Sequence, residues 1–299
     1  MSIAARIGHA LLTAQLHIWA RLPLWLLYLH ADVAAAVLYH VVRYRRKVVR
    51  RNLEGAFPEK TKAELRRIER QFYRNFADYA VETIKLLHVS DRTILSRMQF
   101  EGIELIDSLL DRGLDVACYF SHCDNWEWVP SITLHSRHSA ATAAFCQVYR
   151  PLKDRWFDAL MLRLRSRFGS HSLPKSTVLR SLLRLRHDGL RTVTGFMADQ
   201  KPSHGDDSFV TTFLNRPTAM ITGTETLARR MGMAAVYMDM YKTGRGRYRA
   251  VIRPMCDSAA DTAPGELTAM YTRMLETTIR RNPAIWLWSH NRWKRPVKL

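Results

Sequence analysis

The sequence predicts an α/β fold: a mostly parallel central sheet covered by helices, with a membrane-anchoring helix at the N-terminus. Short apolar runs typical of strands alternate with longer segments of helical spacing, which is the pattern of a parallel, helix-covered sheet. An apolar stretch over residues 22–42 comes before any of these runs. With 47% hydrophobic residues in 299, the chain can bury a substantial core.

The apolar stretch at 22–42 is long enough to cross a hydrocarbon core of about 30 Å. Asp32 lies near its centre, however, and an acid at that depth costs roughly 2.5–3.5 kcal/mol on insertion scales. Two interpretations therefore stay open: a marginal membrane span, or a helix that lies in the membrane interface. The stretch lacks the cleavage site of a secretory signal peptide.

A dense basic cluster follows this stretch at 43–51 and predicts that the flank and everything after it face the cytoplasm. We therefore predict two units, a membrane-anchoring segment over 1–51 and the main α/β domain over 52–299. The net charge of +19 would attract nucleic acid, anionic lipid or an acidic protein. The sequence contains no zinc finger, basic zipper or aromatic RNA-binding signature, so the charge favours a membrane surface over nucleic acid.

The remaining elements follow from the spacing of apolar residues. A long amphipathic helix is predicted over 61–88, and its aromatic stripe should pack on the core. The further predicted helices are 102–112, 127–137, 152–168, 175–188, 218–231 and about 265–281. The predicted strands are 115–120, 140–146, 191–198, 234–240 and 247–253, with a hairpin turn at 244–246 before the last. Four unpaired cysteines are typical of a reduced, cytosol-facing protein.

His122 and Glu127 are the most informative pair of residues. The strand at 116–120 ends just before them, and ligands bind where strands of an α/β sheet end. A histidine at such a turn suits general-base chemistry, because its pKa lies near neutrality and a carboxylate fixes its tautomer. If His122 lies in the loop and Glu127 in the first helical turn, Glu127 could fold back to orient the base.

Other polar residues are predicted to line the same crevice. Arg150 follows a strand, where it could bind an acceptor phosphate or stabilise developing negative charge, or be an ordinary surface arginine. Asp199 and Gln200 end another strand, and Asp199 could orient an arginine or take part in catalysis. Asn125 could hold the turn, help to stabilise an oxyanion, or be an N-cap.

The segment Ser-His-x-x-Asn-Trp-Glu, from Ser121 to Glu127, resembles the signature of the bacterial lipid A biosynthesis acyltransferases, within the lysophospholipid acyltransferase group. The resemblance extends in order over about residues 50–295. Its other blocks are Asn52-Leu53 with Ala56 to Glu59, Val148 to Pro151, Arg165 to Gly169, Ala198 to Gln200, Phe213 to Gly223, and Trp288 to Lys294. The resemblance makes Arg150 a site residue. Among the alternating arginines of the 152–168 helix, we choose Arg165 for the pocket and Arg167 second.

The resemblance implies an O-acyltransferase of the bacterial inner membrane, with its catalytic domain on the cytoplasmic face. It would move a fatty acyl chain from an acyl carrier protein thioester to a hydroxyl of a lipid A precursor, an anionic glycolipid. The sequence shows no metal-ligand cluster, so neither a metal nor another cofactor is expected. The alternatives are a lysophospholipid or aminolipid acyltransferase, or a non-catalytic basic protein that binds membranes or nucleic acid.

One departure bears on the choice of acceptor. Glycerol-phosphate acyltransferases of the wider group carry a Phe-Pro-Glu-Gly block well after the histidine. Here the Phe-Pro-Glu of Phe57 to Glu59 lies upstream of it, and Lys60 replaces the glycine. This pattern argues against the glycerolipid branch.

Overall fold

The computed structural model describes residues 3–203, 205–206, 208–295 and 297–298. Its centre is a seven-stranded sheet in the order β1-β9-β8-β2-β5-β3-β4. The strands are β1 (Met98–Glu101), β2 (Val116–Phe120), β3 (Ala143–Tyr149), β4 (His171–Pro174), β5 (Arg191–Met197), β8 (Ala234–Gly244) and β9 (Arg247–Cys256). Neighbouring strands are parallel except β8 and β9, which form the predicted hairpin. The predicted fold class is confirmed.

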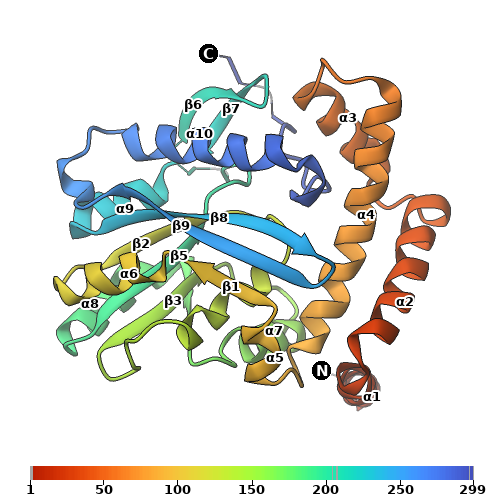
Figure 1. Cartoon of the computed structure of the whole chain (residues 1–299), viewed down its shortest axis with the longest axis horizontal. Coiled ribbons are helices and arrows are strands. Elements are labelled where there is room, and N and C mark those ends of the chain that lie inside the picture. The colour runs from red at the N-terminus through yellow and green to blue at the C-terminus, as the bar shows by residue number, and fades with distance from the viewer. Residues whose placement is uncertain (1–2, 204, 207, 296, 299) are drawn as a thin grey trace.

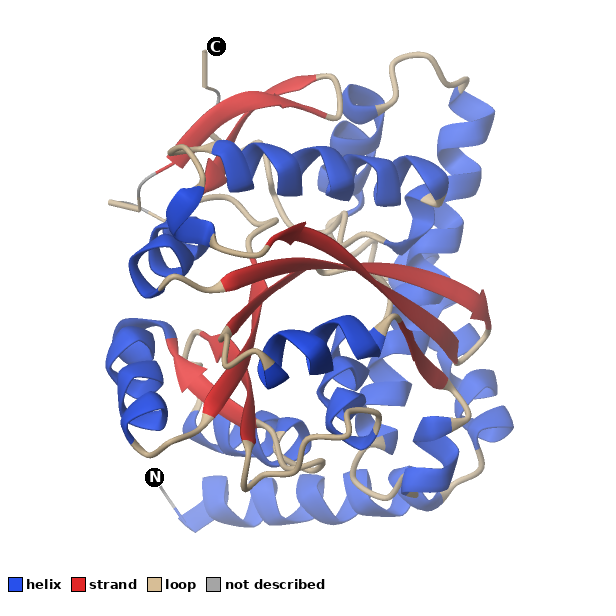
Figure 2. Ribbon diagram, turned by 60° about the vertical axis from the view of Figure 1, so that its left-hand side comes forward, coloured by secondary structure: helices blue, strands red, loops and turns tan. Residues whose placement is uncertain are grey.

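Helices cover both faces of this sheet, with α10 (Glu266–Arg281) on one side and α6 (Ile103–Asp111) on the other (Figure 1). All five residues of β2 are buried, as expected for a strand covered on both faces. The other helices of this body are α5 (Asp91–Leu95), α7 (Arg155–Arg165), α8 (Val178–His187) and α9 (Gly223–Met231). The rotated view in Figure 2 shows that the sheet twists between the helices on its two faces.

The N-terminal helices pack along one edge of this body. They are α1 (Ile3–Arg21), α2 (Leu24–Ala36), α3 (Arg46–Ala56) and α4 (Lys62–Lys85), and a π-helical turn at Val37–Val41 extends α2. Thr61 and Glu64 form a capping box that starts α4. In Figure 1, α4 stands beside the end of the β8–β9 hairpin, and α2 lies on its outer side. The division of the chain after residue 51 stays a prediction; in the structure that boundary lies within α3.

Two predicted helices differ from the structure. Residues 216–221 form a strand, β7 (Arg216–Ile221), which pairs with β6 (Ser208–Phe213), so the helix predicted over 218–231 begins only at Gly223. The connection between the two strands is Leu214-Asn215, both at positive φ, as tight hairpin turns require. The helix predicted over 127–137 is a 3₁₀ helix at Trp126–Leu134, which contains Pro130, a residue without a backbone donor. The short strands β1 and β4 were not predicted.

Candidate active site

Sheet register brings His122 and Asp199 together. In the parallel pair of β2 and β5, Phe120 lies opposite Met197. His122 and Asp199 each follow two residues later, so the same register places them side by side at the carboxyl ends of the strands. His122 Nδ1 lies 2.8 Å from Asp199 Oδ1, and the His122 backbone N–H donates to Oδ2 at 3.1 Å.

This geometry defines the tautomer of His122. An ionised carboxylate only accepts hydrogen bonds, so Nδ1 carries the proton and Nε2 keeps its lone pair. Burial alone would raise the pKa of Asp199, but the electrostatic attraction of the His122 ring and the hydrogen bonds from His122 and Trp286 outweigh it and lower the pKa to about 2. The Trp286 indole donates to Oδ2 at 2.8 Å. Asp199 therefore stays ionised at neutral pH and holds Nε2 as the basic nitrogen.

Glu127 makes different contacts from those predicted. Its carboxylate accepts two hydrogen bonds from Arg165, at 2.6 and 2.8 Å, and one from the Trp126 indole at 3.1 Å. The Tyr79 hydroxyl lies 3.5 Å away. Among the described residues Glu127 has no hydrogen bond with His122, because the 3₁₀ helix turns its side chain toward α7. The predicted contact of Glu127 with His122 is therefore corrected, because Asp199 occupies that position; a role of Glu127 in catalysis stays a prediction.

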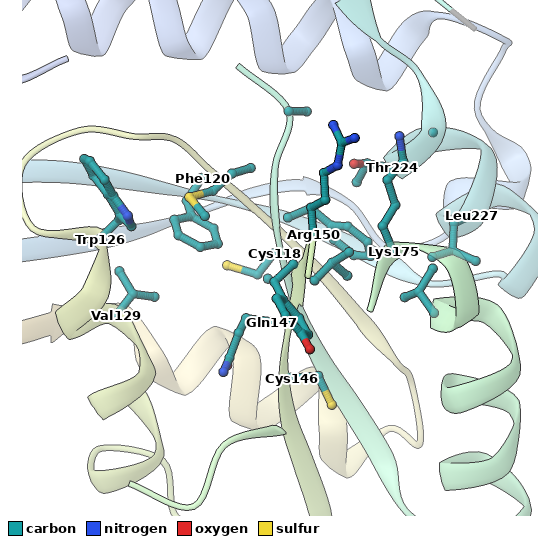
Figure 3. A pocket seen from close by; sticks show the side chains of 18 of the residues that line it. Cys118, Phe120, Trp126, Val129, Cys146, Gln147, Arg150, Lys175, Thr224 and Leu227 are labelled. Carbon is teal, nitrogen blue, oxygen red and sulfur yellow. The ribbon is translucent and has the colours of Figure 1, made fainter. Parts of the chain in front are cut away.

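His122 opens on a cavity of about 770 Å³ that runs between the sheet and α7–α9. Its wall is largely apolar, and includes Phe120, Val129 and Leu227 (Figure 3). Arg150 and Lys175 extend toward the same rim of the cavity, near Thr224 (Figure 3). Lys175 is paired with Asp206 at 2.8 Å, whereas Arg150 is exposed and has no ion pair within the described part of the chain.

Several predicted residues line this cavity together. They are His122, Glu127, Arg150, Arg165 and Gln200. The Gln200 amide nitrogen lies 3.2 Å from His122 Nε2 and is the hydrogen-bond partner of this basic nitrogen in the structure. Burial would lower the pKa of Arg165, but its hydrogen bonds to Glu127 outweigh this and raise it. Arg165 is thus a permanently charged part of the wall.

Two predicted residues lie elsewhere. Arg167 donates to the backbone carbonyl of Val89 and lies 3.6 Å from Asp91, away from the cavity lining. Two positions past Arg165, it projects toward the opposite side of the helix end. Asn125 is fully buried and donates to Glu82 at 2.7 Å. It stands at the N-cap position without a capping bond, so the N-cap alternative is wrong, and its side chain instead connects the loop to α4.

Among the residues that contact the candidate site and were not predicted, Trp286 binds Asp199 and Glu82 binds Asn125. Trp286 lies just before the Trp288 to Lys294 block, and this position beside the block is the one sequence signal that could have found it. Glu82 is a buried acid within the aromatic stripe of α4, and it also accepts from the hydroxyls of Tyr28 and Tyr248 at 3.0 and 2.7 Å. Asn75 and Asp78 precede Glu82 at helical spacing on the same face of α4, and this run of polar residues is the signal that could have found it.

The cysteine beside the base has no nucleophilic role in this geometry. Cys123 is fully buried, and burial raises the pKa of its thiol well above the ordinary value. Since the thiolate is the nucleophile, a buried thiol of this kind is inert.

Comparison with known proteins identifies the family to which this chain belongs. The family model of the bacterial lipid A biosynthesis acyltransferases matches residues 2–295. This chain belongs to that family. The acyltransferase is 24% identical over 287 residues to a lipid A biosynthesis palmitoleoyltransferase of Escherichia coli K12, covering 94% of this chain and 90% of the relative. It is 25% identical over 256 residues to a lipid A biosynthesis lauroyltransferase of the same strain, covering 85% and 80%. The predicted family resemblance is confirmed.

Proposed function

We propose that this acyltransferase moves a fatty acyl chain from an acyl carrier protein thioester to a hydroxyl of a lipid A precursor, at the cytoplasmic face of the bacterial inner membrane. The observation that carries the proposal is the His122–Asp199 pair at the mouth of a largely apolar cavity. The volume of about 770 Å³ lies within the range of ligand pockets and suits an acyl chain.

His122 Nε2 is proposed as the general base. The acceptor hydroxyl displaces the Gln200 amide, gives its proton to Nε2, and its oxygen forms a bond to the thioester carbonyl carbon. The tetrahedral intermediate then collapses, the carbon–sulfur bond breaks, and the thiolate leaves with the proton returned from His122. Asp199 stabilises the imidazolium that exists between these two transfers. No acyl-enzyme is needed, because the thioester is already activated.

The cationic groups suggest how the two substrates are held. Arg150 is proposed to bind a phosphate of the acceptor or to stabilise the developing oxyanion, since it is exposed at the cavity rim. The exposed faces of α7 and α8 carry Arg163, Arg180 and Arg184, which would attract an acidic carrier protein.

The test is acyl transfer by the detergent-solubilised protein, with wild type beside His122→Ala and His187→Ala. His187 is an exposed histidine at the end of α8 and serves as the matched control. Acyl carrier protein thioesters are offered with a lipid A precursor and, in parallel, with a lysophospholipid. We expect transfer to the lipid A precursor that is lost only in His122→Ala.

The other outcomes revise the proposal in defined ways. Transfer to the lysophospholipid alone would overturn the acceptor and keep the reaction. Full activity of His122→Ala would remove the general base. Transfer from acyl-coenzyme A but not from the carrier protein would overturn the donor. Activity in neither acceptor arm would favour a binding protein.

A further inference from the structure

Helix α2 has two apolar faces with different surroundings. One face is buried on α4, where Leu24, Leu27, Ala31 and Ala35 pack against Ala77 and Val81. The opposite face carries exposed apolar side chains at intervals of four residues: Trp25, Leu29, Val33, Val37 and Val41. Trp25, Val33 and Val41 are 66%, 65% and 74% exposed. Helix α1 adds Ile7, Leu11, Leu12 and Ile18. We call this set the apolar strip, and an exposed set of this kind marks an interaction surface.

Polar contacts connect the two ends of α2 to opposite ends of α4. Lys85, the last residue of α4, donates to the carbonyls of Ala20 and Leu22 at 2.9 and 2.8 Å. Just beyond α2, Arg46 and Arg50 of α3 pair with Glu69, nearer the start of α4, at 3.2 and 3.0 Å. Helix α2 therefore lies lengthwise along α4 and antiparallel to it.

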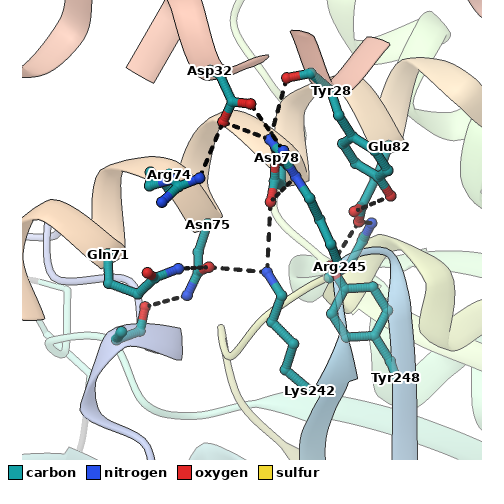
Figure 4. Close-up of polar contacts among 12 residues, drawn as sticks. Tyr28, Asp32, Gln71, Arg74, Asn75, Asp78, Glu82, Lys242, Arg245 and Tyr248 are labelled. Atoms are coloured by element: carbon teal, nitrogen blue, oxygen red, sulfur yellow. Dashed lines mark hydrogen bonds and ion pairs between the residues drawn. The ribbon is translucent and has the colours of Figure 1, made fainter. Parts of the chain in front are cut away.

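Ion pairs also hold the centre of α2. Asp32 accepts from Arg245 of the β8–β9 hairpin at 2.9 and 3.0 Å, and Arg245 also pairs with Asp78 of α4 at 2.6 Å (Figure 4). Arg74 lies 3.6 Å from Asp32 on the other side. The acid inside the apolar stretch is thus part of an ion network between α2, α4 and the hairpin.

This network conflicts with a membrane span. By length and composition Leu24–Val41 could cross a bilayer. A spanning α2 would either take α4 into the hydrocarbon or separate from it. Helix α4 carries charged residues along its length, each costing roughly 2.5–3.5 kcal/mol in the membrane centre. Separation would leave Asp32 unpaired in the bilayer centre and expose the buried face of α2.

We infer that the apolar strip is a monotopic membrane-contact surface, on which α2 lies parallel to an anionic bilayer without crossing it. Exposed cations stand beside the strip in the sequence, Arg21 before α2 and Arg43 and Lys47 after it. Each cation close to an anionic leaflet contributes about 1 kcal/mol, so the charge complements such a surface. An amphipathic helix in the interface buries only its outer face, which leaves the ion network with α4 intact.

The strip also leads toward the cavity. The Trp156 indole of α7 donates to Thr13 of α1 at 3.1 Å, and His9 stacks on the Trp156 ring. Just before α7, Leu152 is exposed and lines the cavity. A lipid acceptor could pass from the bilayer to His122 along this side; this last step rests on the proposed function, whereas the membrane contact does not.

Depth-dependent quenching separates a parallel helix from a spanning one. Single cysteines replace Trp25, Leu29, Val33, Val37 or Val41 in the full-length protein with Cys256→Ser, the other native cysteines being buried. Each is labelled with an environment-sensitive fluorophore and bound to phosphatidylethanolamine–phosphatidylglycerol vesicles with quenchers at defined depths. Leu183→Cys, on the exposed face of α8, is the control. We expect equal, shallow depths at all five positions and no quenching at 183.

Two results would overturn the inference. A depth that passes through the bilayer centre near position 33 would show that α2 spans, and an absence of quenching at all five positions would show that the strip does not contact lipid. Neither readout uses acyl transfer, so failure of the proposed function is seen separately.

A binding experiment tests the same surface without labels. The triple variant Trp25→Ser, Leu29→Ser, Val33→Ser should bind phosphatidylglycerol vesicles at least about tenfold more weakly than wild type. The matched control Leu95→Ser, Leu183→Ser, Val210→Ser removes exposed apolar side chains elsewhere and should bind as wild type. Thermal unfolding monitors the fold of both. Equal weakening of the two folded triple variants would assign membrane contact to general hydrophobicity and reject the strip.

Discussion

Asp199→Asn should inactivate the acyltransferase by reversing the tautomer of His122. Oδ2 of Asp199 accepts from both the His122 backbone N–H and the Trp286 indole. In the variant, these two donors require the amide oxygen at that position, so the amide nitrogen must take the place of Oδ1, which lies 2.8 Å from His122 Nδ1. Two donors cannot face each other, and Nδ1 therefore gives up its proton. The proton moves to Nε2, which then has no lone pair for the acceptor hydroxyl.

The magnitude follows from the loss of the base. General-base catalysis contributes roughly 10²–10⁴-fold, which is about 2.7–5.4 kcal/mol of barrier. We expect kcat to fall by that factor, with a smaller change in KM. The assay is acyl transfer under saturating donor, for Asp199→Asn, His122→Ala and the double variant. Because both changes remove the same base, the double variant should be no slower than either single variant.

Two results would contradict this role of Asp199. If Asp199→Asn kept kcat within about threefold of wild type in a folded protein, Asp199 would not control the tautomer, given a base worth roughly 10²–10⁴-fold. Additive losses in the double variant would likewise show that the two residues act in separate steps.

Three further predictions concern residues around this pair. Burial raises the pKa of Asp124 from 3.8 to about 7, so the native state holds a proton that the unfolded chain releases. Stability should therefore fall as pH rises from about 4 to 7, by up to about 4 kcal/mol from this group. Urea unfolding should show a clearly shallower fall for Asp124→Asn than for wild type, and equal slopes would contradict this assignment. A Cβ at Gly195 would stand 2.8 Å from the Phe120 ring, so Gly195→Ala should narrow the cavity. The ratio of kcat/KM for shorter over longer acyl chains, measured with competing thioesters, should rise by on the order of tenfold. An unchanged ratio would place the acyl chain elsewhere. Glu82→Gln places an amide donor among the donors of Asn125 and two tyrosines, and should cost about 1–3 kcal/mol of stability in thermal unfolding.

The sequence predicted the strands that end before the candidate site residues but could not show which strands are neighbours. Apolar runs located the strands that end before His122 and Asp199, and both residues were predicted to line one crevice. Their contact depends on β2 lying beside β5 in the register Phe120 to Met197, which separates them by 77 positions in the chain but by 2.8 Å in space. The sequence instead favoured Glu127 as the partner of His122, because the two residues are five positions apart in the chain.

The N-terminal segment shows the same limit. Its apolar composition predicted membrane contact, and Asp32 left two orientations open. Only the partners of Asp32 separate them, and those partners, Arg245 and Arg74, lie far along the chain on other elements. An acid that is costly in a lipid-exposed span is ordinary in a helix that packs its polar residue against a charged domain.

The two carboxylates of the site are separated by Trp126. Its ring meets His122 edge-on at 5.0 Å, and its indole N–H donates to Glu127. Glu127 therefore pairs with Arg165 and not with His122. Without Glu127 the largely buried charge of Arg165 would be unpaired, which would cost about 3–5 kcal/mol of stability. Loss of activity in a Glu127 variant would therefore report the charge left on Arg165 and would not show contact with His122. A double-mutant cycle distinguishes the two: strong coupling of Glu127 with Arg165, and additivity of Glu127→Gln with Asp199→Asn, is the expected result, while strong coupling with Asp199 would return Glu127 to the role of orienting the base.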